Sequence, residues 1–493
     1  MSERVANRTR VAAAFDKHIL RELVAIVGRE YVLHDPADLL IFEYDAAIDR
    51  SLPQVVVLPE TAEQVSEVVK LARRHGLPVT PRGAGTGLSG GAIAEMGGVV
   101  LVLTRMTRIL EVDHQEGTAL VEAGVVNLEL SRAVQHYGLY FAPDPSSQRA
   151  CTVGGNVAEN AGGPHCLAYG VTTNHVLGLE LVLADGEIVW VGGRIRDLPG
   201  YDLTGAVIGS EGTLAIVTKA LVRLLRLPEA VFTLLAIFDE MDQASNAVSA
   251  IISQGFVPAA LEMIDREIIQ AVEPALHVGY PMDAEAVLLI ELEGLREAVA
   301  EEGEAVTRVC QAQGAREVRV AEDGPERERL WAGRKGAIGA LGRLTPNWYV
   351  VDGTVPRTRL PEVLRRVAAV GQKYDFHIAN VFHAGDGNLH PNILFDARQP
   401  GETQRVLEAG SEIMRICVDA GGTITGEHGI GLEKRRFMPW LFSENDLEAM
   451  RRLKAVFGAG ELLNPGKIFP ASEGPGDTSQ EQVIRSMGPD AYV

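Results

Sequence analysis

The chain has 493 residues, 46% of them hydrophobic and 23% charged, which is typical of a soluble globular protein with more than one domain. Its formal net charge of −20 excludes a sequence-independent nucleic-acid binder and gives no general attraction to anionic lipid. No run approaches the roughly 18 apolar residues of a membrane span, and the four cysteines are widely spaced without a C-x-x-C pair. We therefore expect a cytoplasmic protein with no iron–sulfur cluster of its own, which can reach a membrane only through partner proteins.

Short strands and helices with clear start and stop signals open the chain. We expect a mainly helical segment over residues 1–52, a strand over 54–59, a helix over 61–76 and a strand over 77–81. Thr61 and Gln64 form the capping-box pattern at the start of the helix over 61–76, and Gly76 can end it. The strand over 77–81 leads directly into a loop that is unusually rich in glycine.

That loop, 80-TPRGAGTGLSGGA-92, contains five glycines and adds Arg82, Thr86 and Ser89 as hydrogen-bond donors. Glycine at this density permits positive φ angles and lets successive backbone N–H groups converge on an anion. No Gly-Lys-Ser/Thr follows, so the loop is not a Walker loop, and no long helix opens after it as a Rossmann fingerprint requires. A flexible surface loop is the alternative, and we favour a diphosphate cradle.

Two further polar loops rich in small residues, 143–163 and 209–218, follow in the same α/β region. Around them we expect strands over 98–104 and 118–124, a helix over 127–138 that Asn127 caps, and a hairpin of strands 176–184 and 187–192. Asp185-Gly186 favours a type I′ turn in that hairpin. Three such loops in one region fit a long extended ligand better than a single phosphate.

The pattern changes after Pro228, a plausible domain boundary. Strands are expected over 231–238, 286–293 and 315–321, alternating with helices over 241–254, 296–313 and 325–343, before a last helix over 444–457. This alternation suggests a sheet covered by helices on one face. We divide the chain into a helical segment over 1–52, a first domain over 53–228, a second over 229–470, and a disordered tail over 471–493.

The densest group of reactive side chains is 383-HAGDGNLHPN-392. If Asp386-Gly387 forms a two-residue hairpin turn, His383 lies directly opposite His390 and Asn392 projects to the same face. Cross-strand Cβ atoms are then about 4.5–5.5 Å apart, which suits two imidazoles on one metal ion. The alternative is a hairpin whose histidines merely line a surface.

A second motif, 425-TGEHGIG-431, adds Glu427 and His428 between glycines. Two histidines and one carboxylate leave metal coordination positions open for a substrate. Because adjacent loop residues generally point apart, we assign Glu427 to the metal and His428 to proton transfer. Arg334 is a candidate clamp for a carboxylate, which guanidinium groups bind bidentately.

Together, the glycine loop, 209-GSEGTLAI-216, 383-HAGDGNLH-390 and 425-TGEHG-429 resemble the FAD-linked 2-hydroxy-acid oxidoreductases of the vanillyl-alcohol oxidase superfamily. Within it, the likeness is greatest to the branch of bacterial glycolate oxidase FAD subunits and D-lactate dehydrogenases. The resemblance covers the chain from about Gln54 to Pro470. It implies an α+β fold: a PCMH-type FAD-binding domain, a ferredoxin-like α+β substrate domain, and a C-terminal helical segment that returns to the flavin.

The resemblance also implies roles for individual residues. The FAD diphosphate would contact the glycine loop at Arg82, Gly83, Ala84, Gly85, Thr86, Gly87, Leu88 and Ser89. The flavin and its ribityl chain would contact Ser147, Thr152, Gly154, Gly155, Asn156, Glu211, Gly212, Ile216 and Asn464. His383, His390 and Glu427 match the family's ligands for a divalent metal, discussed as zinc, manganese or iron. His428 matches the catalytic base, Arg334 the carboxylate-binding arginine, and Asn392 a polar residue that contacts substrate.

Departures from the family pattern bear on the size of the substrate and on how the flavin is attached. Hydroxyglutarate dehydrogenases carry a lysine where Val350 stands and a threonine where Ile338 stands, which favours a short monocarboxylate such as glycolate or D-lactate here. The glycine loop has no histidine for covalent flavin attachment, so we expect non-covalent FAD, with His165 and Cys166 as the alternative attachment points. The resemblance suggests an iron–sulfur subunit and a second FAD-binding subunit as partners. Competing functions are a D-2-hydroxyglutarate dehydrogenase, a non-catalytic FAD subunit of an electron-transfer complex, and a metal-binding regulatory protein.

Overall fold

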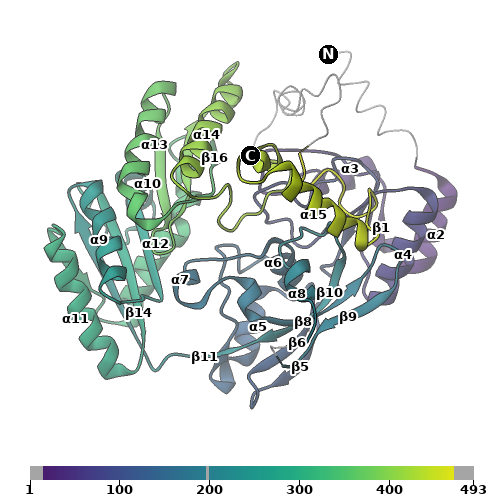
Figure 1. Ribbon diagram of the computed structural model, residues 1–493, viewed down its shortest axis with the longest axis horizontal. Coiled ribbons are helices and arrows are strands. Elements are labelled where there is room, and N and C mark those ends of the chain that lie inside the picture. Colours follow the sequence, from purple (N-terminus) through teal and green to yellow (C-terminus); the bar gives the residue numbers. More distant parts are fainter. Residues whose placement is uncertain (1–14, 196–198, 471–493) are drawn as a thin grey trace. The chain divides into compact units, whose positions relative to one another are not determined.

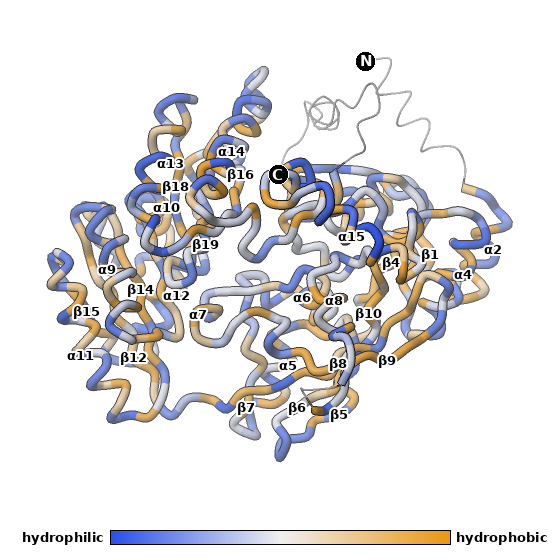
Figure 2. Tube along the Cα trace, viewed as in Figure 1, coloured by the Kyte–Doolittle hydropathy of each residue, from blue (hydrophilic) through white to orange (hydrophobic). Residues whose placement is uncertain are grey.

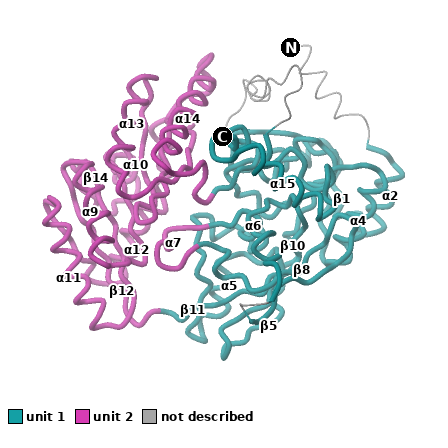
Figure 3. Tube along the Cα trace, in the orientation of Figure 1, with its two compact units in different colours: residues 1–161, 171–227, 428–487 teal, residues 162–170, 228–427, 488–493 magenta. Residues whose placement is uncertain are grey.

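The structure is a computed structural model that describes residues 15–195 and 199–470. The chain divides into two compact units (Figure 3). Unit 1 contains residues up to 161, then 171–227, and the C-terminal segment from 428; unit 2 contains 162–170 and 228–427. The predicted disordered tail over 471–493 lies outside the described residues, as does the start of the predicted helical segment. Every described helix is too short or too polar to span a lipid bilayer.

The N-terminal part of unit 1 forms a four-stranded sheet of order β1-β2-β4-β3, of which β1 is labelled in Figure 1. Its elements are β1 (Val32–Leu33), β2 (Val55–Val57), β3 (Val79–Arg82) and β4 (Val99–Val102), with α2 (Lys17–Val27), α3 (Pro36–Leu39) and α4 (Ala62–His75). The apolar faces of α2 and α4 bury against this sheet in one core. The predicted helix ends are confirmed: the Thr61 hydroxyl accepts the N–H of Gln64 at 3.3 Å, and Gly76 ends α4 with a φ of 62°. The capping box is incomplete, because the Gln64 side chain accepts the N–H of Glu60 at 2.7 Å and not that of Thr61.

The rest of unit 1 is built on a five-stranded antiparallel sheet of order β5-β6-β10-β8-β9. Its strands are β5 (Ile109–Asp113), β6 (Thr118–Glu122), β8 (Val176–Val182), β9 (Ile188–Gly192) and β10 (Ile216–Arg223), with a small pair β7 (Leu139–Tyr140) and β11 (Leu225–Arg226). Helices α5 (Asn127–Val134), α6 (Val153–Glu159), α8 (Leu203–Val207) and α15 (Glu444–Val456) complete the unit. Figure 2 shows α15 as largely hydrophilic, and Leu447 is its only buried residue.

Two local predictions in unit 1 are wrong. The β8–β9 turn is not type I′, because that type needs two positive φ angles and only Gly186, at 84°, has one; its N–H donates to Leu183 O at 2.9 Å. Asn127 does not cap α5, since the capping position is Val126. The Asn127 amide instead donates to Pro143 O and Asn156 Oδ1, both at 2.9 Å, and so ties the second polar loop to the helix.

Unit 2 is built on a nine-stranded sheet. Its strands are β12 (Ala230–Phe238), β13 (Ala260–Asp265), β14 (Ala286–Gly294), β15 (Glu317–Val320), β16 (Asn347–Val350), β17 (Gly353–Thr354), β18 (Ile378–His383), β19 (Asn388–Leu389) and β20 (Pro391–Phe395). Its helices are α7 (Cys166–Tyr169), α9 (Met241–Ser253), α10 (Arg266–Leu276), α11 (Arg296–Ala312), α12 (Gly324–Leu341), α13 (Leu360–Tyr374) and α14 (Glu402–Asp419). The order β15-β12-β14-β13-β18 places the long apolar strands at the centre of the sheet.

Helices cover both faces of this sheet, so the prediction of a one-sided layer is wrong. On one face, Leu235 and Ile237 of β12 pack in a core that includes α10 and α12. The alternate residues Leu234, Ala236 and Phe238 are also fully buried, and α9 and α11 contact β12. An uninterrupted apolar strand, rather than an alternating one, is the sequence signal for such two-sided burial.

Candidate active site

The glycine loop of unit 1 follows β3 and turns at residues that only glycine accommodates readily. Gly85 and Gly90 have φ angles of 73° and 79°. A side chain at Gly85 would collide with the Arg82 guanidinium, whose Nη1 donates to Tyr44 O at 2.8 Å. Arg82 therefore supports the loop from within the protein. The same loop contains Gly83, Ala84, Thr86, Gly87 and Leu88, which stay predicted contacts of the diphosphate.

The second polar loop is shaped by close packing at the start of α6. Thr152 caps this helix by accepting the N–H of Gly155 at 3.2 Å. A Cβ at Gly154 would lie 2.6 Å from Ala123 Cβ, so glycine is required there. Asn156 accepts a hydrogen bond within the protein, as described above, and the Ser147 carbonyl accepts the N–H groups of residues 150 and 151.

The third loop brings Glu211 and Gly212 together at consecutive positive φ angles of 52° and 67°. Ile216 starts β10 and is buried in the core. Asn464 arrives from the C-terminal segment, and its amide donates to Gly91 O at 2.8 Å and Glu211 O at 2.7 Å. Unit 1 therefore brings all three polar loops and Asn464 into one assembly.

Unit 1 retains polar atoms that suit a bound FAD. Ser89 is fully buried, yet its hydroxyl has no hydrogen-bond partner among the described residues, and the same holds for Oδ1 of buried Asn464. Buried polar groups are normally satisfied, so unpaired atoms of this kind fit a site completed by a ligand. The glycine loop and Ser89 are the residues that would hold the diphosphate.

In unit 2, the two predicted histidines and Glu427 converge. Glu427 Oε1 lies 2.9 Å from His383 Nε2 and 3.5 Å from His390 Nε2. One ligand atom from each residue lies within 4.8 Å of the others, and the two imidazole centroids are 5.2 Å apart. The donor types and spacing fit a divalent metal with open coordination positions.

The predicted hairpin register behind this convergence is wrong by two residues. His383 pairs with Asn388, not with His390, and the turn spans four residues over 384–387. Tertiary contacts select this turn: Gly385 N–H donates to Leu261 O at 3.0 Å, and Gly387 O accepts from Val355 N at 2.9 Å. Because side chains alternate with period two, a shift of two keeps both histidines on one face.

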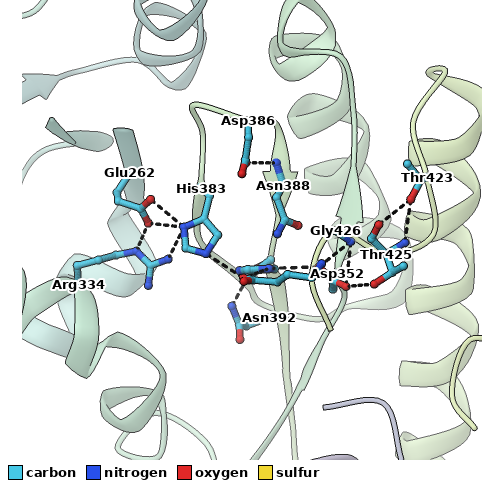
Figure 4. A network of polar contacts seen from close by, with 12 residues as sticks. Glu262, Arg334, Asp352, His383, Asp386, Asn388, Asn392, Thr423, Thr425 and Gly426 are labelled. Atoms are coloured by element: carbon cyan, nitrogen blue, oxygen red, sulfur yellow. Dashed lines mark hydrogen bonds and ion pairs between the residues drawn. The ribbon is translucent and has the colours of Figure 1, made fainter. Parts of the chain in front are cut away.

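Glu262, on β13, fixes the orientation of His383 and was missed by the sequence analysis. His383 Nδ1 lies 2.8 and 2.9 Å from the two carboxylate oxygens of Glu262, and Arg334 Nε donates to the same carboxylate at 2.5 Å (Figure 4). A carboxylate on the far nitrogen of a metal-binding histidine is a common supporting arrangement. A glutamate inside the apolar strand 260-ALEMID-265 was the available signal.

Buried side chains of opposite charge surround His383. Burial lowers the pKa of His383, but Glu262 and Glu427 outweigh it and hold that pKa well above its usual value. Burial raises the pKa of Glu262, whereas Arg334 and His383 together bring it below its usual value. The positive charges of Arg334 and His383 and the negative charges of Glu262 and Glu427 thus stabilise one another inside the protein.

Asp352, also missed, holds the loop that carries Glu427. Its carboxylate accepts the Thr425 hydroxyl at 2.6 Å and the N–H of Gly426 at 3.1 Å, and Oδ1 lies 3.4 Å from His390 Nε2 (Figure 4). Asp352 is fully buried. Its position after β16 gave no local pattern from which this contact could be read.

Three further residues were predicted to act on the substrate: Arg334, Asn392 and His428. Arg334 lies beside the triad, with Nη2 3.4 Å from His383 Nδ1. Asn392 is fully buried, its amide donates to Ala379 O and His390 O, and its Oδ1 has no partner among the described residues. His428 belongs to unit 1, although the preceding residue, Glu427, belongs to unit 2.

A second histidine and glutamate group in unit 2 is an ion-pair network. His165, Glu291 and Glu293 are close enough to share an ion. However, Glu291 already accepts two N–H groups of Arg327 at 2.8 Å and the Trp331 indole N–H at 2.6 Å. The guanidinium supplies the positive charge that a metal would bring. This network attaches the segment over 162–170 to the sheet of unit 2.

Two family models match the chain, one over the region of the polar loops and one over the region of the histidines and Glu427. An FAD binding domain matches residues 53–192, and the C-terminal domain of FAD linked oxidases matches residues 227–468. The protein is therefore an FAD-linked oxidoreductase. Within that class, it belongs to the family that contains the glycolate oxidase subunit GlcD and D-lactate dehydrogenase, as its similarity to curated relatives shows.

The relatives cover almost the whole chain. Glycolate oxidase subunit GlcD of Escherichia coli (strain K12) is 46% identical over 94% of this chain and 92% of its own length. GlcD of Bacillus subtilis (strain 168) is 40% identical over 92% of this chain and 97% of its own. D-lactate dehydrogenase of Archaeoglobus fulgidus is 37% identical over 84% of this chain and 91% of its own.

Solved structures share the fold at low sequence identity. p-Cresol methylhydroxylase matches with a TM-score of 0.78 and 17% identity, over 92% of this chain and 96% of its own. Alkyldihydroxyacetonephosphate synthase matches with a TM-score of 0.72 and 20% identity, over 92% and 86% of the two chains. The predicted fold is thereby confirmed.

Proposed function

We propose that the protein oxidises a short 2-hydroxy acid, glycolate or D-lactate, to the 2-oxo acid. The observation that carries the proposal is the convergence of His383, His390 and Glu427, backed by Glu262, in a chain whose relatives are a glycolate oxidase subunit and a D-lactate dehydrogenase. FAD would be held by the glycine loop of unit 1 and would supply the hydride acceptor for the oxidation. A divalent metal, when bound by the triad, supplies Lewis-acid stabilisation of the substrate oxygens.

Side chains of the protein perform the remaining steps. His428 accepts the proton of the substrate hydroxyl, so that the oxygen carries negative charge as the carbonyl forms. Arg334 binds the substrate carboxylate; Glu262 occupies its Nε and fixes the guanidinium plane, leaving its other edge for this contact. Asn392 contributes a polar contact on the same face as the histidines.

Two apolar residues of unit 2 support a small substrate. Val350 pairs with Asn392 across β16 and β20, and Ile338 packs against the apolar core of α10 and α12. Neither side chain can pair with a second carboxylate. We infer that D-2-hydroxyglutarate is a poor substrate, because its distal carboxylate would lose its hydration without a partner.

Electrons leave the reduced flavin through another molecule in this proposal. The described residues include four cysteines, three of them buried, and the possible metal-holding groups among those residues contain no cysteine. The GlcD relatives are named as subunits, which supports assembly with partner subunits. We propose an iron–sulfur subunit and a second FAD-binding subunit as these partners. We place the complex in the cytoplasm, with any membrane association supplied by those partners.

Anaerobic flavin reduction tests the proposal directly. Purified protein loaded with FAD and metal is mixed with glycolate, D-lactate, L-lactate or D-2-hydroxyglutarate, and flavin absorbance is followed. We expect glycolate or D-lactate to bleach the flavin, and D-2-hydroxyglutarate to act at least about tenfold more slowly. Absence of bleaching by every acid in the loaded protein would refute the proposed function.

The role of His428 is tested in the same assay. His428→Ala should bind FAD normally and lose substrate-driven bleaching by about 100-fold or more, the usual range for removing a general base. His136→Ala, an exposed histidine of unit 1, is the matched control and should bleach like the wild type. Wild-type bleaching by the His428 variant would remove it from the mechanism.

A further inference from the structure

The segment after His428 is fixed to the glycine loop within unit 1. Ser89 O accepts the N–H groups of Leu432 at 2.8 Å and Glu433 at 3.2 Å. Gly431 has a φ of 51°, and a side chain there would collide with the Ser89 carbonyl. The backbone at 431–433 therefore lies directly against the loop that is expected to hold the FAD diphosphate.

Glu211 makes the other attachment of this segment. Its Oε1 accepts the N–H of Ile430 at 2.6 Å, and its Oε2 accepts the N–H of Gly431 at 2.7 Å. Glu211 is 4% exposed, so solvent does not compete for these bonds. Hydrogen bonds from N–H to a carboxylate are among the stronger ones in proteins. Both oxygens thus bind the chain two and three residues after His428.

The backbone of Glu211 is itself constrained. Its φ of 52° is uncommon for a residue with a side chain and costs conformational energy. Its N–H donates to Ala158 O at 2.8 Å, and its carbonyl accepts the Asn464 amide at 2.7 Å. Two elements of unit 1, α6 and the C-terminal segment at Asn464, therefore hold the backbone of Glu211, whose carboxylate binds the segment after His428.

We propose that Glu211 is a positioning residue, which fixes His428 on the flavin-binding unit by clamping the backbone at Ile430 and Gly431, and that it does not bind FAD through its side chain. The inference rests on the proposed role of His428 as base. It changes the assignment that the family resemblance suggested for Glu211, because both carboxylate oxygens are already engaged. The clamp acts on geometry: a base displaced by about 1 Å loses roughly 100-fold in rate.

The test compares Glu211→Gln with a matched control. Glutamine keeps the size of the side chain but offers one acceptor and presents an N–H₂ group to the second backbone N–H. Glu122→Gln is the control, since Glu122 is a buried glutamate of unit 1 that accepts the backbone N–H of Arg108 at 2.8 Å and pairs with its guanidinium.

Three measurements separate the possibilities. Hydrogen exchange of the peptide over 428–434 is measured on FAD-loaded protein without substrate, and we expect about tenfold faster exchange in Glu211→Gln, as for loss of one such bond. FAD affinity, from a fluorescence titration, should stay within about threefold of wild type. The rate of flavin reduction should fall about 10- to 100-fold with little change in KM. The control should match wild type in all three.

Each outcome decides the proposal. A tenfold or larger loss of FAD affinity in Glu211→Gln would show a cofactor contact and overturn it, as would unchanged hydrogen exchange or unchanged flavin reduction. Partial recovery of the reduction rate in Glu211→Asp, which restores both acceptors on a shorter arm, would support the clamp. If wild-type flavin is bleached by no hydroxy acid, the proposed function fails, whereas hydrogen exchange still decides whether Glu211 holds the segment.

Discussion

The two units form their sites from different groups of atoms. In unit 1, the loops expected to hold FAD are shaped by the backbone, through glycines at positive φ and close approaches such as that of Gly154 to Ala123. Unit 2 relies on charged side chains whose partners are also side chains, as in the group of Glu262, His383 and Arg334. Substitutions that add atoms at glycines should therefore weaken FAD binding by unit 1, and substitutions that remove charge should weaken metal binding by unit 2.

The largest expected effect is on metal binding by unit 2. Glu427→Gln removes the one charged ligand of the triad, and we expect metal affinity to fall by more than ~100-fold. Metal content after dialysis measures this, and FAD affinity should not change. Glu293→Gln, which alters a carboxylate of the same unit that accepts the Tyr169 hydroxyl, is the control. Full metal content in the Glu427 variant would disprove the triad.

A single methyl group should damage unit 1. Gly154→Ala places a Cβ 2.6 Å from Ala123 Cβ and 2.9 Å from its carbonyl oxygen, which displaces the start of α6. Overpacking of this kind costs about 1–3 kcal/mol, and we expect FAD to bind about tenfold more weakly.

The matched control is Gly339→Ala in α12, where no atom lies within 4 Å of the added Cβ. That change should be neutral or stabilise by about 0.5–1 kcal/mol, because alanine favours a helix interior. FAD titration and thermal unfolding measure both variants. Normal FAD binding by Gly154→Ala would mean that the second loop does not contact the cofactor.

Metal affinity should fall less when the substitution changes a residue that orients a metal-binding side chain than when it changes the metal-binding side chain itself. Glu262→Gln leaves His383 in place but weakens the contact at Nδ1, and metal affinity should fall about 10- to 100-fold. Competition with a chelator measures the change. Glu267→Gln, at an exposed contact with His377, is the control. Equal affinity in the Glu262 variant and wild type would show that orientation of His383 is unimportant.

The smallest functional effect is expected at Glu291, although stability should change. Burial raises the pKa of Glu291, but His165 and Arg327 outweigh it and bring the pKa well below its usual value. Such a carboxylate stabilises the fold above its unfolded pKa near 4.3, and this stabilisation is lost as pH falls toward the lower folded value.

We therefore expect Glu291→Gln to be less stable than wild type by about 3 kcal/mol at neutral pH, because Arg327 and Trp331 lose their charged acceptor. The difference should shrink as pH falls below about 4. Urea unfolding at pH 7 and pH 3 measures it. A difference that persists or grows in acid would contradict the pairing.

Local chemistry explains which features the sequence could predict. The ends of α4 follow from Thr61, Gln64 and Gly76, which act on their own helix. The two histidines of the triad could be predicted to lie together, because a hairpin whose register shifts by two residues keeps the same side chains on the same face. The register itself could not be predicted, because Leu261 and Val355, distant in sequence, select the longer turn.

Supporting residues were missed for the same reason. Glu262 lies 121 residues before His383, and Asp352 lies 75 residues before Glu427, so no short motif contains either pair. The uninterrupted apolar run of β12 indicates burial on both faces of the sheet, whereas the alternation of strands and helices led to the prediction of helices on one face only. Conversely, Glu211 belonged to a recognised motif, and only its hydrogen bonds to residues 219 and 220 positions later indicated a structural partner.

The return of the C-terminal segment to unit 1 bears on how the protein is made. Val79 N–H donates to Leu462 O, Asn464 N–H donates to Val79 O, and Leu463 is part of the core that contains α4. During synthesis, residues 162–170 and 228–427 of unit 2 are translated before these residues, so unit 2 can begin to fold before unit 1 is complete. A nascent chain that stalls before Leu462 would carry every metal-binding residue and the glycine loop, yet would lack the last strand contact of the flavin-binding unit.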